Sequence, residues 1–228
     1  MELNVARSEF KYAISEIAAA RVRANLGDVI TRDPMGGSTG YMVRSLYFDT
    51  PDDRDYYDKI DGLEVRQKVR LRIYSPKDKT AKLELKRKEG AYQWKRSIIL
   101  SREDAELLSE GRYSIVREKM ESPFSRQLLL MMELNGYAPK TLIEYHRLAF
   151  IANTDNTRIT FDTSLRASQS GLDLFAAHPA YHPVLHPPIL EVKYTHFFMS
   201  HIKFALNVAN QMPMAISKYC LGRQISFY

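Results

Sequence analysis

The feature that most constrains the fold is a pair of neighbouring segments, residues 64–74 and 81–88, in which charged and apolar residues alternate. A period of two is typical of a β-strand that packs one face on an apolar layer. Gln67 is the one polar residue on the apolar side. Turn-forming residues between the two segments predict a hairpin. The charged side carries Glu64, Arg66, Lys68, Arg70, Arg72, Lys82, Glu84, Lys86 and Lys88.

Neighbouring cations on this predicted face leave two interpretations open. Like charges that stand side by side on a sheet repel, so they need either solvent or an anion with many charges. An antiparallel sheet with its polar face in water is common. The sharper alternative is a groove or barrel interior that binds a polyanion, and the hairpin alone does not decide between them.

The composition favours a soluble, intracellular protein. Lys and Arg number 33 against 27 Asp and Glu, and the net charge of +6 mildly favours phosphate-rich partners. The single cysteine, Cys220, excludes an internal disulfide and suits a reducing compartment. No apolar run approaches the roughly 20 residues of a membrane span, and charges near the start disfavour a signal peptide. We therefore expect a cytoplasmic location.

Several other segments repeat the alternation and predict an antiparallel fold with an enclosed charged surface. Mixed Arg, Lys and Glu recur two residues apart, so each charge is expected to be offset by a neighbour or a ligand. Antiparallel strands with a charged inside make a barrel or tunnel. The expected further strands are 6–14, 41–50, 91–100, 142–152, 158–162 and 189–194. The expected helices are 15–25, 51–61, 101–111, 122–136 and 196–211, with Ser15, Ser101 and Ser122 at helix starts.

Eight short motifs occur in order along nearly the whole chain. They are Arg7-Ser-Glu9-Phe-Lys11-Tyr12, Ser45-Leu-Tyr-Phe-Asp49, Arg70-Leu-Arg72, Glu84-Leu-Lys86-Arg-Lys88, Tyr145-His-Arg147, Arg158-Ile-Thr-Phe-Asp162, Leu190-Glu191-Val-Lys193 and Ser217-Lys218-Tyr219. Together they resemble the polyphosphate polymerase domain of the vacuolar transporter chaperone (VTC) complex, which belongs to the CYTH, or triphosphate tunnel metalloenzyme, superfamily.

This resemblance implies an α+β fold, with an eight-stranded antiparallel β-barrel (the triphosphate tunnel) and helices packed on the outside, as a single domain over residues 1–228. It implies a metal-dependent enzyme that transfers the γ-phosphate of ATP onto a growing polyphosphate chain inside a basic tunnel. ATP, polyphosphate or pyrophosphate would be the partners. Phosphoryl transfer needs positioning and charge stabilisation more than a protein nucleophile, and the sequence has no GxxxxGK[ST] loop.

The resemblance also implies roles for individual residues. Catalytic cations that grip the phosphates would be Lys11, Arg70, Arg72, Lys86, Lys95, Arg147, Arg158 and Lys218. Lys88, Lys193 and Ser217 would bind substrate. Glu191 would hold Mn²⁺ or Mg²⁺, and Glu9 and Glu84 would add to the metal site or neutralise cations, as would Asp162.

Two departures from the superfamily pattern bear on the activity. Hydrolases and cyclases of the superfamily typically begin with ExExK, whereas Arg7 replaces the first acid here. This form resembles the polymerase branch, although a triphosphatase, a nucleotide cyclase or a non-catalytic polyphosphate binder stays open as an alternative. Members that export their product carry a regulatory domain and membrane helices, which are not expected in this sequence. Either the product stays in the cytosol, or a separate membrane partner handles it, or activity has been lost. Nucleic acid is not an expected partner, because acids alternate with the cations.

Three histidines at four-residue spacing invite a zinc interpretation. Each of them, His178, His182 and His186, is followed by proline, which breaks the helix that such spacing needs. The least regular stretch, residues 164–188, is instead expected to be a lid or an insertion loop.

Overall fold

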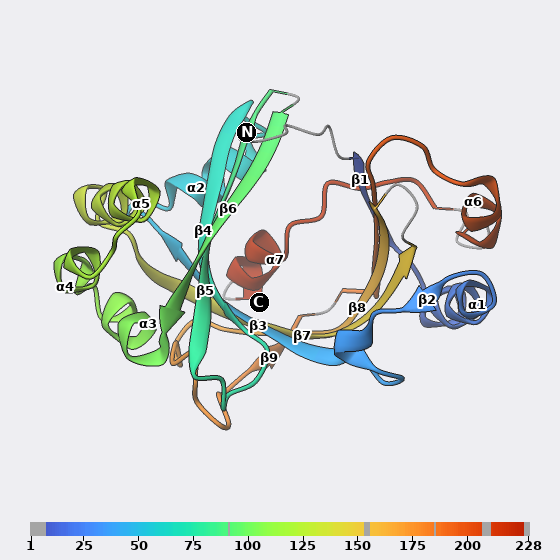
Figure 1. Cartoon of the computed structure of the whole chain (residues 1–228), viewed down its shortest axis with the longest axis horizontal. Helices are drawn as coiled ribbons and strands as arrows, with labels where there is room; N and C mark the ends of the chain where they lie inside the picture. The colour runs from blue at the N-terminus through green and yellow to red at the C-terminus, as the bar shows by residue number, and fades with distance from the viewer. Residues whose placement is uncertain (1–7, 91, 153–155, 185, 207–210, 226–228) are drawn as a thin grey trace. The chain divides into compact units, whose positions relative to one another are not determined.

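The computed structural model describes residues 8–90, 92–152, 156–184, 186–206 and 211–225 (Figure 1). The strands are β1 (Ser8–Ala13), β2 (Thr31–Arg32), β3 (Tyr41–Asp49), β4 (Val65–Ile73), β5 (Thr80–Glu89), β6 (Tyr92–Ser101), β7 (Ala138–Ala152), β8 (Thr157–Ser168), β9 (His182–Pro183) and β10 (Ile189–Tyr194). The helices are α1 (Glu16–Gly27), α2 (Arg54–Ile60), α3 (Arg102–Ser109), α4 (Tyr113–Glu118), α5 (Pro123–Leu134), α6 (Ser200–Leu206) and α7 (Lys218–Gln224).

The longer strands follow one another in the order β1-β10-β8-β7-β3-β4-β5-β6, while β2 pairs with β7 and β9 with β8. Each strand pair whose register is defined in the described residues is antiparallel. Helices pack against the apolar side of the strands in both units. The predicted α+β class with eight antiparallel strands is therefore confirmed.

Backbone contacts divide the chain into two compact units. Unit 1 comprises Met1–Met42, Tyr145–Leu165 and Leu185–Ser217, and unit 2 comprises Val43–Glu144, Arg166–Val184 and Lys218–Tyr228. Three strands, β3, β7 and β8, continue from one unit into the other. The interpretation of the whole chain as a single domain stays a prediction.

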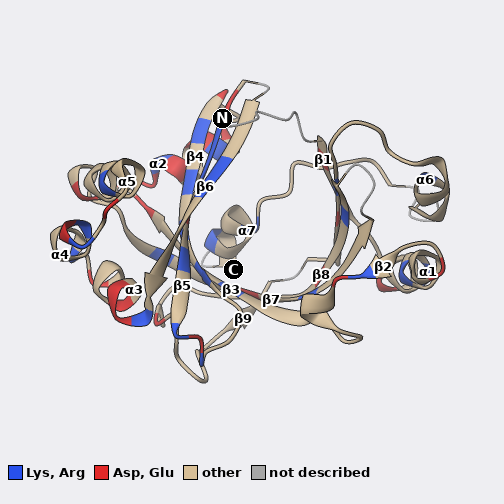
Figure 2. Ribbon diagram, viewed as in Figure 1, with Lys and Arg blue, Asp and Glu red and all other residues tan. Residues whose placement is uncertain are grey.

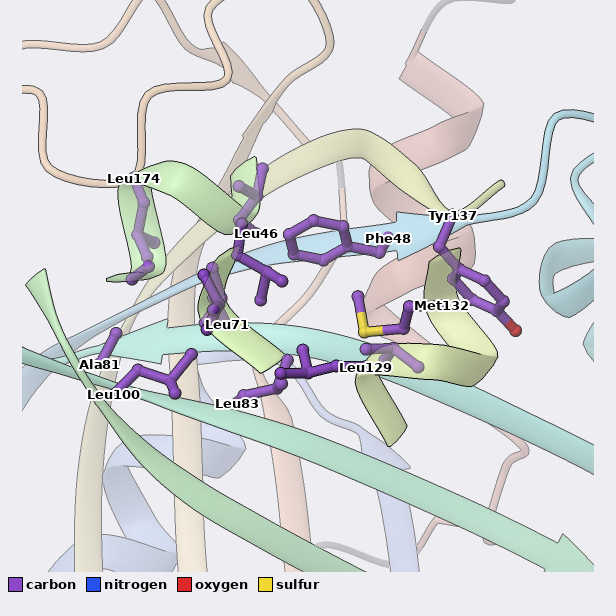
Figure 3. Packing of buried hydrophobic residues seen from close by; sticks show 14 of the residues in the cluster. Leu46, Phe48, Leu71, Ala81, Leu83, Leu100, Leu129, Met132, Tyr137 and Leu174 are labelled. Carbon is purple, nitrogen blue, oxygen red and sulfur yellow. The ribbon is translucent and has the colours of Figure 1, made fainter. Parts of the chain in front are cut away.

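The core of unit 2 lies between the β4–β5 hairpin and the helices α3, α4 and α5 (Figures 1 and 3). Leu71 and Leu83 stand opposite each other on the two strands and are fully buried with Leu129 of α5. Burying one such side chain contributes about 2 kcal/mol. Gln67, the polar exception on this side, donates a hydrogen bond to the Tyr137 hydroxyl at 2.7 Å. Because alternate residues of a strand point to opposite faces, the charged residues of the hairpin lie on the other side.

The core of unit 1 lies between α1, α6 and the strands β1, β10 and β8. Val22 and Leu26 of α1 are fully buried and pack with Phe161 of β8 and Leu190 of β10. Ile202 of α6 completes this contact. The apolar sides of β8 and β10 are thus covered by helices, which places their charged residues on the opposite side.

Three helix starts agree with the sequence prediction. Ser15, Ser101 and Ser122 each accept a hydrogen bond from the backbone N–H three residues further along. Each of these caps is worth about 1 kcal/mol. The caps fix where α1, α3 and α5 begin.

Strands β7 and β8 extend beyond the segments predicted for them. β7 begins at Ala138 rather than at residue 142, and β8 continues past Asp162 to Ser168. The hydroxyl of Thr141 donates to the Ser168 carbonyl at 3.1 Å, which joins the two extensions. The prediction of irregular structure from residue 164 is therefore wrong as far as Ser168. Ser164 has φ of 53°, a left-handed conformation that interrupts the two-residue period there.

The C-terminal part also differs from the prediction. Helix α6 begins at Ser200 rather than at residue 196, and Phe198, which precedes it, stacks on Tyr194 of β10 with ring centroids 4.9 Å apart. The helix is described as far as Leu206, and Gln211, its predicted last residue, is not helical. The predicted strand residues 6 and 7 lie outside the described residues. Within the described parts of the chain, no helix has the length and apolar character needed to cross a membrane.

Candidate functional site

Rows of cations run across three neighbouring strands of unit 2 (Figure 2). Lys68, Lys86 and Lys95 stand directly opposite one another on β4, β5 and β6. Arg66 faces Lys88 in the adjacent row. Directly opposed like charges destabilise a sheet unless a counter-charge is present. We call this surface the cationic face, and it comprises Arg66, Lys68, Arg70, Arg72, Lys82, Glu84, Lys86, Lys88 and Lys95.

Glu84 is the acidic member of the cationic face. Its carboxylate lies 2.7 Å from Nε of Arg70, 2.8 Å from Nζ of Lys95 and 3.7 Å from Nη1 of Arg72. Burial alone would raise the pKa of Glu84, but these three cations lower it well below its ordinary value. Glu84 therefore stays ionised and orients two arginines that were predicted to bind phosphate.

A tyrosine that the sequence did not single out also belongs to this surface. Tyr47 of β3 stands opposite Arg70, which donates from Nη1 to the Tyr47 hydroxyl at 2.9 Å. Burial would raise the pKa of Tyr47, but Arg70, Arg72 and Lys68 together lower it to about 8. The register that brings Tyr47 to Arg70 depends on strand pairing, which the sequence does not reveal.

Helix α7 is attached to unit 2 on the side of the cationic face. The Tyr219 hydroxyl donates to the buried Asp49 carboxylate at 2.5 Å, and Arg223 donates twice to Asp53, at 2.8 and 2.7 Å. Nζ of Lys68 lies 5.9 Å from the centre of the Tyr219 ring. Lys218, a predicted phosphate ligand, is the first residue of this helix and is half-buried. Its position thus depends on carboxylates in unit 2.

In unit 1 the first and last long strands bring together a cluster of two acids and two lysines. Glu9 stands opposite Lys193, and Lys11 stands opposite Glu191. Nζ of Lys11 lies 3.0 Å from Glu9 and 3.9 Å from Glu191, while Lys193 pairs with Glu191 and lies 3.9 Å from Glu9. We call these residues the Glu–Lys cluster. Each lysine of the cluster lies beside both acids, so the positive and negative charges balance.

Two predicted arginines lie on neighbouring strands of the same unit. Arg147 of β7 donates to both oxygens of Asp162, at 2.6 and 2.7 Å. Burial would lower its pKa, but Asp162, Tyr145 and Glu191 raise the pKa of Arg147 well above its ordinary value. Asp162 thus neutralises a largely buried guanidinium.

Arg158 of β8 is held by two partners that the sequence did not indicate. Its Nη2 donates to Asp33 at 2.6 Å and to the Tyr41 hydroxyl at 2.9 Å. Asp33 also begins the short 3-10 turn at Pro34–Gly36 by accepting the N–H of Met35. One carboxylate therefore shapes this loop and orients a predicted phosphate ligand.

The predicted site residues divide between the two units. Unit 1 holds Lys11, Arg147, Arg158, Lys193, Ser217, Glu9 and Glu191. Unit 2 holds Arg70, Arg72, Lys86, Lys88, Lys95, Lys218 and Glu84. Glu84 therefore contacts cations of its own unit, and its role as a metal ligand stays a prediction.

The carboxylates of the Glu–Lys cluster suit a hard divalent cation. The carboxylates of Glu9 and Glu191 lie within 4 Å of the Lys11 ammonium, at 3.0 and 3.9 Å. Thr160 of β8 stands opposite Glu191. The Thr160 hydroxyl is buried without a hydrogen-bond partner among the described residues. The described residues contain no group of three or more His, Cys, Asp or Glu side chains arranged for a metal. Mg²⁺ commonly binds to one or two carboxylates and takes its other ligands from substrate phosphates and water, so the donor set fits such an ion.

The fold is thus an antiparallel sheet that carries charged residues on one side in each unit. The sequence matches the VTC domain over residues 6–227. The chain therefore belongs to the VTC domain family, as the resemblance of its motifs predicted. No curated protein matches the sequence.

The comparison with solved structures found several similar chains, of which one supports the fold. A provisionally assigned adenylate cyclase from Bacillus halodurans is 14% identical with a TM-score of 0.54, and the match covers 92% of this chain and 95% of that one. A provisionally assigned adenylate cyclase from Vibrio parahaemolyticus is 14% identical with a TM-score of 0.46, covering 90% and 85%. The PH1012 protein from Pyrococcus horikoshii is 8% identical with a TM-score of 0.49, covering 94% and 98%. The first of these shows that the fold is shared.

Proposed function

We propose that this protein is a metal-dependent polyphosphate polymerase that uses ATP. The observation that carries the proposal is the cationic face, in which opposed rows of Lys and Arg surround the buried carboxylate of Glu84. A phosphate chain supplies a negative charge at every unit and suits such a surface. Membership of the VTC domain family supports the same substrate class.

In the proposed reaction the terminal phosphate oxygen of the chain attacks the γ-phosphorus of ATP. A new P–O bond forms, the bond between the γ-phosphorus and the bridging oxygen breaks, and ADP leaves with the electron pair. Catalysis of this kind depends on positioning and on stabilising the charge of the transferred group. In unit 2, Arg70 and Arg72 would grip phosphate oxygens in two-point contacts, while Lys86, Lys88 and Lys95 would supply point charges.

In unit 1, Glu191 and Glu9 would hold Mn²⁺ or Mg²⁺. The ion would supply charge neutralisation on phosphate oxygens. Lys11 and Lys193 pair with these carboxylates and would offer ammonium groups to phosphate. Arg147 and Arg158 are oriented by Asp162 and Asp33 and would bind phosphate oxygens with the remaining edges of their guanidinium groups.

A triphosphatase or cyclase is the second candidate, and the fold shared with the Bacillus halodurans protein favours keeping it. Water would attack the phosphorus in a triphosphatase, and the ribose 3′-hydroxyl would attack it in a cyclase. The polymerase is preferred because the family match covers nearly the whole chain. A polyphosphate binder without turnover, in the cytosol or beside a membrane partner, would use the same cationic face.

The proposal is tested with Glu191→Gln, which keeps the shape of the side chain but removes its charge. We expect turnover of ATP to be lost and Mn²⁺ binding, measured by electron paramagnetic resonance, to weaken by about tenfold or more, while binding of a long phosphate chain is retained. Glu106→Gln, at an exposed site on α3, is the matched control. Full turnover by Glu191→Gln in the presence of Mn²⁺ would rule out the metal assignment.

A further inference from the structure

We propose that Tyr47 is a positioning residue of the cationic face: its hydroxyl orients Arg70, and it must remain protonated for the face to hold a phosphate chain at full affinity. The inference rests on the proposed function, because it concerns the surface to which phosphate chains are proposed to bind. It adds to that function a proton-dependent control of affinity.

The geometry connects Tyr47 to the cationic face through Arg70. Nη1 of Arg70 donates to the Tyr47 hydroxyl at 2.9 Å, and Nε donates to Glu84 at 2.7 Å. A guanidinium is planar and its donors are fixed in a fork. Two contacts at two of its nitrogens therefore set the plane in which Arg70 can meet a phosphate group.

The ring of Tyr47 cannot easily leave this position. It is only 4% exposed and stacks on Tyr219 of α7, with ring centroids 5.2 Å apart and planes 20° apart. Tyr219 is held in turn by its hydrogen bond to Asp49. The hydroxyl of Tyr47 is thus kept beside Arg70, whatever its protonation state.

The charges around Tyr47 favour loss of its proton. Arg70, Arg72 and Lys68 of β4 outweigh the effect of burial and lower its pKa to about 8. The acids nearby are already engaged, Glu84 of β5 by Arg70 and Lys95, and Asp49 of β3 by Tyr219. On α7, Tyr219 stacks on the ring and Arg223 is paired with Asp53.

A phenolate at Tyr47 would compete with phosphate for the same cations. Binding of a phosphate chain and loss of the proton oppose each other, and the coupling between them is reciprocal. A bound phosphate chain must therefore raise the pKa of Tyr47. Deprotonation must weaken phosphate binding by the same factor.

The first test follows the formation of tyrosinate by its ultraviolet absorbance as the pH is raised. The full chain is expected to show a step near pH 8 that Tyr47→Phe lacks and that moves to higher pH when inorganic tripolyphosphate is added. Tyr92→Phe removes a tyrosine that is 75% exposed on the other side of β6 and is expected to keep the step. A step that persists in Tyr47→Phe, or that tripolyphosphate does not move, overturns the inference.

The second test measures the affinity for tripolyphosphate by calorimetry at about pH 7 and pH 9. Between these values the natural protein is expected to lose about tenfold more affinity than Tyr47→Phe, since one pH unit above a pKa leaves about a tenth of the group protonated. Ionisation of the ligand is the same for both proteins. Equal losses overturn the inference alone, whereas no binding to the natural protein at pH 7 overturns the proposed function with it.

Discussion

At the scale of single residues, the charged surfaces of this protein are organised by a few buried carboxylates. Glu84 is 3% exposed and contacts two arginines and a lysine, and Asp162 is 2% exposed and binds Arg147 through both oxygens. A buried charge without a partner is costly, so these acids fix where the cations lie. The acids thereby orient the guanidinium groups that are proposed to bind phosphate.

Replacing Glu84 by Gln tests this organisation. The variant leaves Arg70, Arg72 and Lys95 close together without their counter-charge, so we expect a loss of about 2–3 kcal/mol in the free energy of unfolding at pH 7, measured with urea. That estimate is reduced because Lys95 is half exposed. Because the pKa of Glu84 is lowered by folding, its stabilising effect is complete above its unfolded pKa of about 4.3.

The same variant gives a pH dependence. As the pH falls below about 4, Glu84 takes up a proton in the unfolded chain before it does so in the folded protein. The free energy of unfolding that Glu84 contributes therefore decreases as the pH falls toward the pKa of the folded state. The difference in stability between the natural protein and Glu84→Gln should therefore shrink between about pH 4 and pH 3. A difference that grows with acidification would mean that another group dominates.

Arg70 and Arg158 are expected to contribute to binding as well as to rate. Each is oriented by a carboxylate, so alanine at either position removes a preorganised guanidinium. We expect the affinity for tripolyphosphate to fall about tenfold or more in each variant, as typical for a lost charge-assisted hydrogen bond. Arg117→Ala, which removes a surface ion pair with Glu133, serves as the control. Unchanged affinity in Arg70→Ala would exclude the cationic face as the binding surface.

At the scale of elements, the positions of the strands could be predicted from the sequence, whereas their pairing and register could not. Alternation in β4 and β5 identified which residues share a face, because side-chain direction has a period of two. Lys68 was on the correct side, yet only the register shows it in one row with Lys86 and Lys95. Tyr47 was missed for the same reason, since nothing near it in the sequence announces Arg70 as its neighbour.

Helix α7 shows a second limit of sequence reasoning. The sequence of residues 213–221 does not itself indicate a helix or a strand, and the helix begins only at Lys218. It is held by long-range contacts of Tyr219 and Arg223 with Asp49 and Asp53 rather than by local propensity. A helix of seven residues is unstable by itself, so its tertiary contacts decide whether it forms.

Releasing one of these contacts tests the role of α7. Asp53→Asn removes the charge that binds both Arg223 and Lys140. We expect amide hydrogens of α7 to exchange about tenfold faster, corresponding to a local loss of about 1–2 kcal/mol. Tripolyphosphate affinity should fall as Lys218 loses its fixed position. Protected exchange in Asp53→Asn would show that the Tyr219 contact alone holds the helix.

At the scale of the whole molecule, the net charge of +6 understates the charge that a ligand meets. Acids and bases nearly balance over the chain, whereas the cationic face of unit 2 concentrates cations on one side of a hairpin. Ions in solution screen such a surface within a distance of about 8–10 Å. Raising the salt concentration from about 0.05 M to 0.5 M should therefore weaken tripolyphosphate binding several-fold, measured by calorimetry. Affinity independent of salt would argue for an uncharged mode of recognition.

The measurement that tests the central claim most directly is a product analysis of the purified protein with ATP and Mn²⁺, in which ADP, free phosphate and polyphosphate are quantified together. The proposed polymerase predicts polyphosphate in amounts that match ADP, with little free phosphate, and no product from Glu191→Gln. Free phosphate or a cyclic nucleotide without polymer would contradict the claim and assign the protein to hydrolysis or cyclisation, and the absence of any turnover would leave a polyphosphate-binding protein.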